Sequence, residues 1–351
     1  MKINIITVFK SQNCGSFLQA VALKEILSSM GNDVRFLDYN PVIYVMKRKI
    51  LNIIQCCLRF RFKRAFDIIK QEMDFKKHQK MFATSRFDES ADVYFFGSDT
   101  LWNFNDNFFV ENEAFFTGAG LKKPCYTYAM SVGSASKEAF FKRTEAIKNI
   151  QKFKRIAVRD EHTKDVLSEF YYNNELVKTV DPTMLLGKEY YINHFSRISL
   201  SQKKYLLIYH FGAIDEKTWQ DLQRFTKSKN LTILNIGLSG ELPVTCVGFS
   251  PTNFISAFLN AEYIFTNTFH GCVFSTIFNK QFATDGIYKK KVEGFLEEFS
   301  LLDRVVGEED NVEKILTTPV DYDLVNDLVE KARKSSIDYL KNVLDEVKSG
   351  E

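Results

Sequence analysis

The chain has 351 residues, of which 47 are basic and 44 acidic, so its net charge is +3. At roughly 100–200 residues per domain, this length predicts two domains. Apolar residues make up 45% of the sequence and charged residues 26%, a composition that excludes a disordered chain. The near balance of charge excludes a dedicated nucleic-acid-binding protein, and we expect no nucleic acid as a partner.

The six cysteines contain no CxxC pair, and none stands at metal-ligand spacing from a histidine. This pattern argues against a zinc site and a disulfide framework, and it favours a reduced protein of the cytoplasm. We expect neither a metal nor a cofactor. No segment holds the roughly 18 consecutive apolar residues of a membrane span. The first ten residues are interpreted as a strand rather than a signal peptide, because Asn4 and Thr7 interrupt their apolar run.

Short apolar runs alternate with helical periods along the chain. The first run is followed by a polar loop and by apolar residues at helical spacing from Phe17 to Met30, which Gly31 ends. Strands alternating with helices are typical of parallel sheets covered by helices on both faces. The predicted strands are Ile3–Val8, Val34–Leu37, Val93–Phe96, Cys125–Met130, Ile156–Val158, Val177–Val180, Tyr205–Tyr209, Thr232–Ile236 and Tyr263–Phe265.

These strands are too many for one such sheet, so we expect an α/β protein with two Rossmann-like, doubly wound domains that face a cleft. The polar stretch from Lys188 to Lys204 indicates the boundary between them. Residues 1–195 are expected to form the N-terminal domain and residues 196–318 the C-terminal domain. Residues 319–351 show helical spacing and predict one or two helices that pack across the domains.

Residues 47–80 carry eleven basic and three acidic side chains, a positive excess larger than the net charge of the whole chain. Apolar residues at helical spacing accompany them and predict an amphipathic helical insert. Two interpretations stay open. The insert is either a solvated basic face over an apolar stripe that packs on the core, or a patch for anionic lipid or a lipid-linked diphosphate. If the insert binds anionic lipid, each exposed basic residue near the membrane surface contributes about 1 kcal/mol to the binding free energy.

Unusual polar residues stand directly after several of the predicted strands. Ligands of doubly wound sheets bind at the carboxyl ends of strands, so we expect Asn13, Ser98, Arg159 and His270 around one cavity between the domains. The chain contains no G-x-G-x-x-G, no G-x-x-x-x-G-K-[ST] and no G-x-S-x-G. A dinucleotide site, a P-loop and a hydrolase nucleophile elbow are therefore not indicated.

Five blocks of sequence, taken together and in this order, resemble the polysaccharide pyruvyl transferase family. The blocks are Asn13–Ala20, Phe96–Asn103, Val158–Asp160, Asp181–Thr183 and Thr268–Gly271. The resemblance extends from residue 3 to about residue 304. It implies a fold similar to GT-B glycosyltransferases, with the N-terminal domain on the acceptor side and the C-terminal domain on the donor side.

The resemblance also implies an enzyme activity. Family members move an enolpyruvyl unit from the co-substrate phosphoenolpyruvate to sugar hydroxyls, usually leaving a pyruvate ketal and releasing phosphate. We therefore expect a transferase that modifies a hexose of a surface polysaccharide, such as a capsule or exopolysaccharide, or of its lipid-linked precursor. Such an enzyme is expected in the cytoplasm, with peripheral contact to an anionic membrane through residues 47–80.

Within this resemblance, His270 and Arg159 are the expected catalytic residues. Histidine exchanges protons near neutral pH, and His270 lies in a tight loop that opens onto an apolar helix. A guanidinium binds a phosphate or carboxylate through two hydrogen bonds, so Arg159 is the expected ligand of the donor. The alternative for Arg159 is an ion pair with Asp160 or Glu161.

The other expected contacts surround these two residues. Asp99 is the third expected catalytic residue and lies at the acceptor, where it accepts a hydrogen bond or a proton; a helix N-cap is its alternative role. Trp102 stacks on a sugar or fills the core. Lys290 and Lys291 are expected either to contact phosphate or to be solvent-exposed charges. The remaining expected substrate contacts are Asn13, Gly15, Ser98, Ser131, Thr268 and Gly271.

Two positions depart from the family pattern. Thr268 stands where several sugar-modifying members carry Arg, and Asn267 where related sequences often carry Asp. One positive ligand of the donor is therefore missing unless Lys291 or a neighbour replaces it. Two other functions stay open: a GT-B-type glycosyltransferase that uses a nucleotide sugar, and a catalytically silent carbohydrate-binding subunit.

Overall fold

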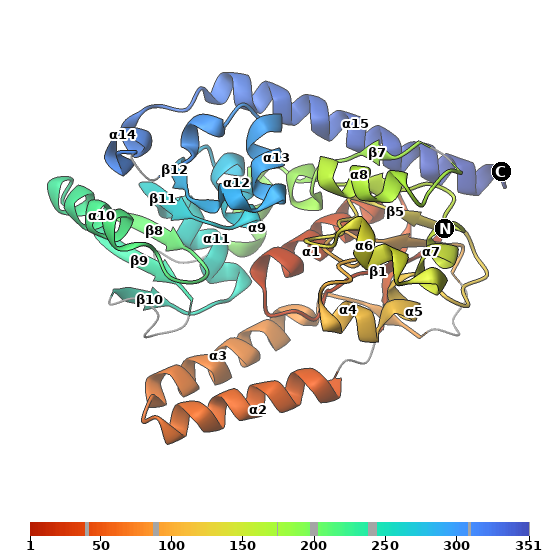
Figure 1. Cartoon of the computed structure of the whole chain (residues 1–351), viewed down its shortest axis with the longest axis horizontal. Coiled ribbons are helices and arrows are strands. Elements are labelled where there is room, and N and C mark those ends of the chain that lie inside the picture. The colour runs from red at the N-terminus through yellow and green to blue at the C-terminus, as the bar shows by residue number, and fades with distance from the viewer. Residues whose placement is uncertain are drawn as a thin grey trace.

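The fold consists of two parallel sheets, each with helices around it, in two adjacent α/β domains (Figure 1). It is seen in a computed structural model, which describes residues 1–38, 42–86, 91–173, 175–196, 203–237, 244–307 and 310–350, without the side chains of residues 42–49. The α/β class with two Rossmann-like domains, predicted from the alternation of strands and helices, is confirmed.

The first sheet has the strand order β3-β2-β1-β4-β5, and its neighbours pair in parallel. A two-stranded sheet, β6-β7, continues it beyond β5 through isolated bridges from Tyr126 to Arg155 and from Met130 to Val158. Crossover connections between parallel strands place all their carboxyl ends at one edge. The strands are β1 (Lys2–Ile6), β2 (Asp33–Leu37), β3 (Thr84–Ser85), β4 (Val93–Phe96), β5 (Cys125–Thr127), β6 (Ala157–Val158) and β7 (Val177–Lys178).

The second sheet repeats this order as β10-β9-β8-β11-β12, again with parallel neighbours. Its strands are β8 (Tyr205–Tyr209), β9 (Thr232–Ile236), β10 (Thr245–Val247), β11 (Tyr263–Thr266) and β12 (Gln281–Thr284). All nine predicted strands are present. Three further strands, β3, β10 and β12, are only two to four residues long and lie at sheet edges.

Polar side chains cap the first turns of three helices. Asn13, Asp160 and Thr268 each accept a hydrogen bond from a backbone N–H of the first turn that follows. The helices of the first half of the chain are α1 (Cys14–Ser29), α2 (Val42–Leu58), α3 (Phe62–Gln79), α4 (Asn107–Glu111), α5 (Glu113–Phe116), α6 (Lys137–Phe141), α7 (Thr144–Ile150), α8 (Glu161–Ser168) and α9 (Lys188–Phe195). Those of the second half are α10 (Glu216–Ser228), α11 (Pro251–Asn260), α12 (Phe269–Ile277), α13 (Lys290–Glu298), α14 (Val312–Thr317) and α15 (Tyr322–Ser349).

The polar stretch expected at the domain boundary is partly helical. Its first half forms α9, whose Tyr191 and Phe195 are buried and which packs on α11. Residues 197–202 lie outside the described residues, so the boundary at residue 195 stays a prediction.

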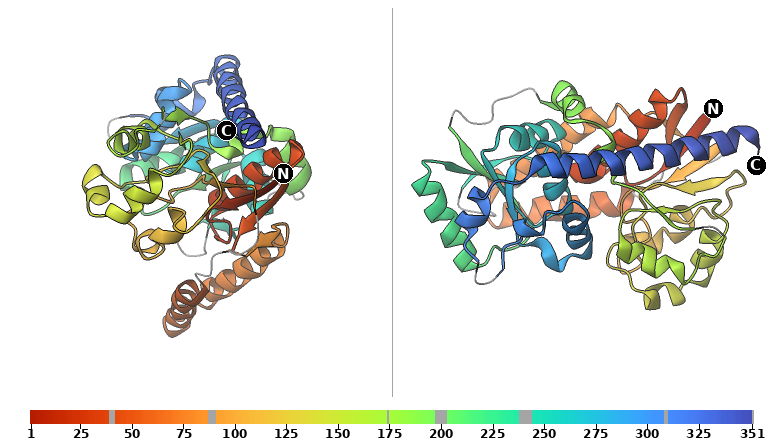
Figure 2. Two further views of the ribbon diagram at one scale, coloured as in Figure 1. Left: turned by 90° about the vertical axis from the view of Figure 1, so that its right-hand side faces the viewer. Right: turned by 90° about the horizontal axis from the view of Figure 1, so that it is seen from above.

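One long helix, α15, lies along both domains (Figure 2, right). At its start, the Tyr322 hydroxyl donates to the carbonyl of Lys280 in the second domain. Farther along, Tyr339 donates to the carbonyl of Thr127 at 2.9 Å, and the Ser336 hydroxyl accepts from the backbone N–H of Val180 at 3.0 Å. The C-terminal segment is thus a single helix fastened to both halves.

The apolar core is continuous between the two domains. One cluster of buried residues includes Ile5 of β1, Phe274 of α12 and Leu340 of α15. A smaller cluster around Leu206 and Phe265 lies in the second domain. The shared core and α15 together fix the relative position of the two sheets.

Helices α2 and α3 form a hairpin that projects from the two domains (Figures 1 and 2). The basic insert is therefore helical, as predicted, with a turn at Arg59–Arg61. The interpretation that its apolar stripe packs on the core is wrong for most of the hairpin. Of the described side chains in α3, only Ala65 and Phe75 are buried. In the described residues, no helix combines the length and hydropathy needed to cross a bilayer.

We expect Leu340→Ala to lower the free energy of unfolding by about 2–5 kcal/mol, because it opens a cavity in the shared core beneath α15. Leu324→Ala on the same helix is the control, since Leu324 is 47% exposed, and it should change stability by less than about 0.5 kcal/mol. Urea unfolding followed by circular dichroism measures both. Equal losses in the two variants would contradict the packing of α15.

Candidate functional site

Four strands of the first domain end at one edge and carry polar residues there. Asp99 follows β4, Ser131 follows β5, Arg159 follows β6, and Asp181 lies just beyond β7. Backbone bridges join these ends, because Asp99 pairs with Met130 and Met130 with Val158. The four side chains therefore start from adjacent backbone positions, as expected for carboxyl ends of parallel strands.

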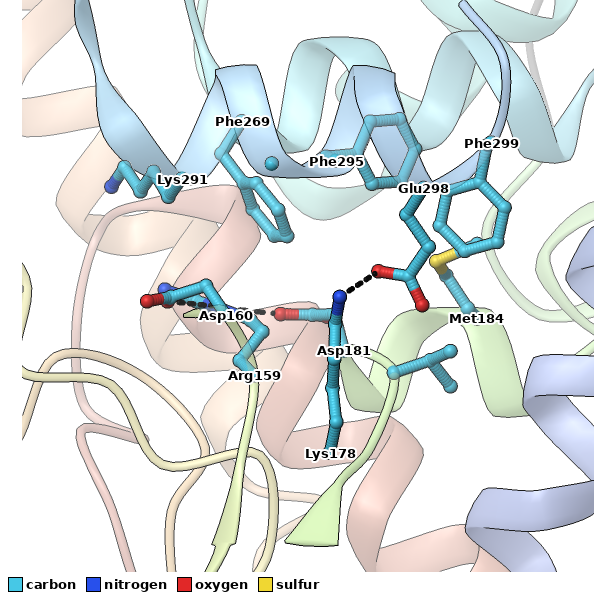
Figure 3. Close-up of a pocket in the computed structure, with 12 residues that line it drawn as sticks. Arg159, Asp160, Lys178, Asp181, Met184, Phe269, Lys291, Phe295, Glu298 and Phe299 are labelled. Atoms are coloured by element: carbon cyan, nitrogen blue, oxygen red, sulfur yellow. Dashed lines mark hydrogen bonds and ion pairs between the residues drawn. The ribbon is translucent and has the colours of Figure 1, made fainter. Parts of the chain in front are cut away.

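The second domain contributes its own carboxyl-end elements to the same place. His270 lies in the first turn of α12, which follows β11, and Lys291 in the first turn of α13, which follows β12. Between the domains lies a cavity of about 350 Å³, including space open to solvent (Figure 3). Its lining comes from both domains and consists of Arg159, Asp160, Lys178, Val180, Asp181, Met184, Phe269, Lys291, Gly294, Phe295, Glu298 and Phe299.

The Arg159 side chain is held in the wall of this cavity, only 3% exposed. Its Nη1 donates to Asp181 Oδ2 at 3.1 Å, and its guanidinium lies 4.5 Å from the ring centroid of Phe269. The Nε atom is 3.9 Å from Asp160 Oδ2. The alternative prediction of an ion pair with Asp160 is thus correct, but the closer carboxylate is Asp181, and Glu161 pairs with Lys178 instead.

Two donor atoms of this guanidinium, Nε and Nη2, have no hydrogen-bond partner among the described residues. A buried donor without an acceptor costs about 1–3 kcal/mol, and more when it is charged. Native proteins leave few such groups unsatisfied, and those that remain call for an explanation such as an absent ligand. An anion with two acceptor oxygens matches the free edge of Arg159.

Asp181 is the buried carboxylate on which Arg159 and His270 converge. Its Oδ1 accepts from the backbone N–H and the hydroxyl of Thr183, at 3.0 and 2.7 Å. Its Oδ2 lies 3.1 Å from Arg159 Nη1 and 3.7 Å from His270 Nε2. Burial alone raises the pKa of Asp181, but His270, Arg159 and Thr183 outweigh it and hold that pKa well below its usual range. The carboxylate is therefore ionised at neutral pH.

His270 lies between Asp181 and the first turn of α1. A Cβ atom placed on Gly15 would be 2.1 Å from His270 Nδ1, so only a glycine lets the imidazole approach this helix. Its Nε2 has no hydrogen-bond partner in the described part of the chain. The imidazole itself is not in the cavity lining, but Phe269 before it and Asp181 beside it are. Two parts of the first domain, the start of α1 and the loop with Asp181, therefore lie against this side chain of the second domain.

Lys291 provides a second cation in the cavity wall. Burial and the positive charge of Arg159 lower its pKa, although the carboxylate of Asp99 acts in the opposite direction. It makes no ion pair with any described residue. The neighbouring Lys290 is exposed and pairs with Glu293 at 2.9 Å, so the two predicted lysines differ. The expectation that Lys291 replaces the charge missing at Thr268 is compatible with this position.

Two of the predicted residues support the cavity indirectly. The Ser131 hydroxyl donates to Asp160 Oδ2 at 3.1 Å and holds that carboxylate near Arg159. Asp99 is half-buried and its Oδ1 accepts from the backbone N–H of Thr100, so it does not cap a helix. Its negative charge faces Lys291 closely enough to influence that ammonium group.

Trp102 and Ser98 lie in the core rather than at the cavity. The Trp102 indole is fully buried, donates to the carbonyl of Phe116 at 2.8 Å and packs edge-on against Phe153. A sugar cannot reach it, so the expectation of stacking is corrected in favour of core filling. The Ser98 hydroxyl is also fully buried and donates to Gln19 Oε1 at 3.1 Å.

The remaining predicted contacts lie at the N-termini of α1 and α12. Asn13 caps α1 by accepting from the N–H of Gly15, and Thr268 caps α12 by accepting from the N–H of Gly271. A Cβ on Gly271 would lie 2.0 Å from Thr266 Oγ1, which explains the glycine there. Neither the two caps, Asn13 and Thr268, nor the two glycines, Gly15 and Gly271, line the cavity. They position His270 and the helix ends near it.

Sequence reasoning did not identify Asp181 or Phe269 as site residues. The signal was available for Asp181, because the run Asp181–Pro182–Thr183 follows a predicted strand in the same way as the other site loops. Phe269 offered no signal, since the chain contains 33 phenylalanines and most pack in the core. In the described residues, no group of three His, Cys, Asp or Glu side chains is placed to hold a metal ion.

Comparison with protein families and solved structures gives two findings. The sequence model of the family described as polysaccharide pyruvyl transferase matches residues 13–284, more than three quarters of the chain. None of the curated protein sequences matches at a significant level.

Among solved structures, the similarity covers nearly the whole length of both chains. Arabidopsis thaliana UGT89C1, complexed with UDP-L-rhamnose, has a TM-score of 0.53 and 12% identity, covering 99% of this chain and 98% of that one. The UDP-GlcNAc 2-epimerase from Neisseria meningitidis, bound to UDP-GlcNAc, has a TM-score of 0.50 and 9% identity, with 100% of each chain covered. The UDP-N-acetylglucosamine 2-epimerase from Rickettsia bellii has a TM-score of 0.50 and 14% identity, covering 99% and 97%. At such low identity these similarities establish the GT-B fold alone.

We expect Asp181→Asn to lower the free energy of unfolding by about 3–5 kcal/mol near neutral pH, because it leaves the buried Arg159 charge without its partner. The depressed pKa of Asp181 stabilises the wild type above the ordinary aspartate value of about 3.9, and this stabilisation is lost as the pH falls through the native value. The difference between the two proteins should therefore shrink in acid. Urea unfolding at several pH values measures it.

The control is Asp327→Asn, an exposed position on α15. Its unfolding free energy should follow that of the wild type at every pH. If the difference between wild type and Asp181→Asn stayed constant from neutral to acid pH, the carboxylate would not be coupled to Arg159 and His270 in the way described.

Proposed function

The chain belongs to the polysaccharide pyruvyl transferase family, and from this premise we propose that it transfers the enolpyruvyl unit of phosphoenolpyruvate to a hexose of a surface polysaccharide. The proposed product is a cyclic pyruvate ketal, with phosphate released. The observation that carries the proposal is the pair of N–H groups, Nε and Nη2, on the buried guanidinium of Arg159: neither has a hydrogen-bond partner among the described residues, and Nε has only the longer ion pair with Asp160 at 3.9 Å.

The charges of the cavity fit a donor that carries both a phosphate and a carboxylate. Arg159 of the first domain and Lys291 of the second line the cavity together with Lys178, and the carboxylates of Asp160, Asp181 and Glu298 line it as well. Asp181 lies against Arg159 and His270, and Glu298 pairs with Lys178. Burial, and after it the positive charge of Arg159, lower the pKa of Lys291, and a doubly anionic ligand between the two cations would offset that repulsion. Phosphoenolpyruvate supplies two anionic groups on a small frame. We propose that Arg159 binds one of them and Lys291 the other.

The transfer adds a proton to a carbon of the donor and removes protons from the acceptor hydroxyls. In the proposed reaction the methylene carbon of phosphoenolpyruvate takes up a proton, and a sugar hydroxyl oxygen bonds to the neighbouring carbon. A second hydroxyl then replaces the phosphate, which leaves with the second proton. His270, whose imidazole lies beside Asp181, is the proposed exchanger of these protons. Asp181 stabilises the imidazolium, since its Oδ2 lies 3.7 Å away.

We also propose that the acceptor is carried by a lipid at the inner face of the cell membrane, and that the chain acts in the cytoplasm at that surface. The described cysteines are all free, which suits a reducing compartment. Asp99 faces Lys291 from the first domain, and its carboxylate is the proposed acceptor contact. The role of Trp102 as a sugar platform is withdrawn, because its indole is buried.

The direct experiment combines the purified chain with phosphoenolpyruvate and a hexose disaccharide, and follows phosphate release together with the mass of the product. A ketal adds the pyruvate unit and leaves its carboxylate but no keto group. Thermal shift with phosphoenolpyruvate against UDP- and GDP-sugars separates this function from a nucleotide-sugar transferase. Stabilisation by a nucleotide sugar alone, without phosphate release in any mixture, would refute the proposal.

We expect His270→Gln and Arg159→Lys to fail in different ways. His270→Gln removes the proton exchanger and should lower kcat by about 10²–10⁴-fold with little change in donor affinity. Arg159→Lys keeps the charge but loses the planar set of donors, so it should raise KM for phosphoenolpyruvate as well as lower kcat. Steady-state kinetics, with melting temperatures as a folding control, resolve the two patterns. Near wild-type turnover by a folded His270→Gln protein would make this histidine structural.

The adjacent lysines provide a matched pair. Lys291→Met should raise KM for phosphoenolpyruvate by roughly 10- to 100-fold, the usual effect of losing a hydrogen bond to a charged group. Lys290→Met should leave KM unchanged, because Lys290 is exposed and paired with Glu293. The same kinetic assay measures both variants. Similar KM values in the two would show that Lys291 does not contact the donor.

A further inference from the structure

The α2–α3 hairpin carries two apolar stripes that no described part of the chain covers. On α3, Phe62, Phe66, Ile69 and Met73 are 46–64% exposed and follow one another at intervals of four, three and four residues, so they share one helix face. On α2, Ile50, Leu51, Ile54 and Leu58 are 47–74% exposed with a similar period. Among the described residues, fifteen large apolar side chains are exposed, and nine of them lie in this hairpin. Contiguous exposure of this kind marks an interaction surface.

The turn between the helices combines these apolar residues with basic ones. Phe60 is 83% exposed, and its ring lies edge-on to that of Phe62 at 6.1 Å between centroids. Arg59, Arg61 and Lys63 alternate with them and are also exposed. Apolar and aromatic side chains next to cations are typical of segments that lie in the headgroup region of a bilayer.

We propose that this hairpin docks on an anionic lipid bilayer, with the turn at residues 58–63 inserted between the headgroups. Between residues 50 and 80 the sequence has eight basic and three acidic side chains, although the net charge of the entire chain is only +3. Each basic residue close to an anionic membrane contributes favourably to binding, and the exposed apolar stripes add the burial of hydrocarbon surface.

The charge and the shape of the surface argue against other occupants. Two copies of the chain would bring two strongly basic hairpins face to face, which like-charge repulsion opposes. An RNA would satisfy the cations, but it would leave Leu58, Ile69 and Met73 in water because aliphatic side chains offer no stacking surface. A bilayer with acidic headgroups satisfies both the charges and the apolar stripes.

The far end of the hairpin is fixed to α1, to α11 and to the loop before α1. Phe75 of α3 packs against Phe17 of α1, with 6.0 Å between ring centroids, and His78 Nε2 lies 3.1 Å from Thr252 Oγ1 of α11. Glu72 accepts a hydrogen bond from the side chain of Gln12. Gln12 directly precedes the N-cap of α1, the helix whose first turn touches His270. A docked hairpin therefore holds the cavity at a fixed distance from the membrane, where a lipid-carried acceptor would be.

This inference extends the proposed function, which calls for an acceptor carried on a lipid, but its test needs neither phosphoenolpyruvate nor a sugar. The full-length chain is sedimented with vesicles of phosphatidylglycerol and phosphatidylcholine, and with vesicles of phosphatidylcholine alone. We expect binding to the anionic vesicles that weakens as salt is raised. The charge variant, Arg59→Gln with Arg61→Gln and Lys63→Gln, should partition about 100-fold less. The apolar variant, Phe60→Ser with Phe62→Ser, should also lose binding.

The controls carry the same changes elsewhere on the surface. Phe141→Ser removes an apolar side chain that is 61% exposed, the same value as Phe62. Lys122→Gln with Lys123→Gln and Lys142→Gln removes three exposed charges from the first domain. Both controls should bind vesicles as the wild type does. Turnover of a soluble disaccharide, where the proposed activity is found, should survive in the hairpin variants.

The outcomes separate the occupants and keep the two proposals distinct. Wild-type binding to anionic vesicles that only the hairpin variants lose supports the inference, whether or not the chain shows transferase activity. Equal loss in the control variants, or no sedimentation of the wild type at low salt, overturns it. A dimer in solution that the apolar variant converts to a monomer, without vesicle binding, also overturns it and assigns the surface to a second copy.

Discussion

The buried carboxylate of Asp181 is the group on which the site depends. It is fully buried, yet it stays ionised because Arg159, His270 and the Thr183 hydroxyl surround it. A buried charge is tolerated only when it is paired and hydrogen-bonded. Asp181 is supplied by the first domain and His270 by the second, so this pairing also joins the domains. The same interaction that stabilises the interface therefore orients the two residues to which we assign the chemistry.

The arrangement leaves the cavity with unsatisfied positive groups. Asp181 uses one oxygen for Thr183 and shares the other between Arg159 and His270, so it does not neutralise Lys291. At the same time Nε and Nη2 of Arg159 have no hydrogen-bond partner within the described part of the chain. Buried donors without acceptors lower the stability of the protein when no ligand is bound. They strengthen the binding of an anion, because the donors are already in position and need no reorganisation. This is the behaviour expected of a site built for a small, doubly charged ligand.

The sequence predicted the fold well because both sheets repeat the same alternation of apolar strand and helix, and long periodic segments are recognisable without a structure. It also indicated which loops approach one another, since parallel strands end at a common edge. It could not decide side-chain direction. Lys290 and Lys291 are neighbours in sequence but differ in exposure, and Trp102 lies in a loop motif yet points into the core. The apolar residues of the hairpin likewise appeared fit for burial, and only the three-dimensional arrangement shows them exposed.

The cavity and the hairpin each place side chains in surroundings that are unfavourable for them. In the cavity, charges are removed from water and held by partners from two domains; in the hairpin, apolar side chains are left in water with cations around the turn. Both conditions are costly in an isolated chain. In our proposals each cost is offset by a molecule of matching chemistry, an anion with two acidic groups at Arg159 and an acidic bilayer at Phe60. The Gln12 loop contacts α3 on one side and begins α1 against His270 on the other, so a single short segment connects the surface that would meet the lipid with the residue that would exchange the proton.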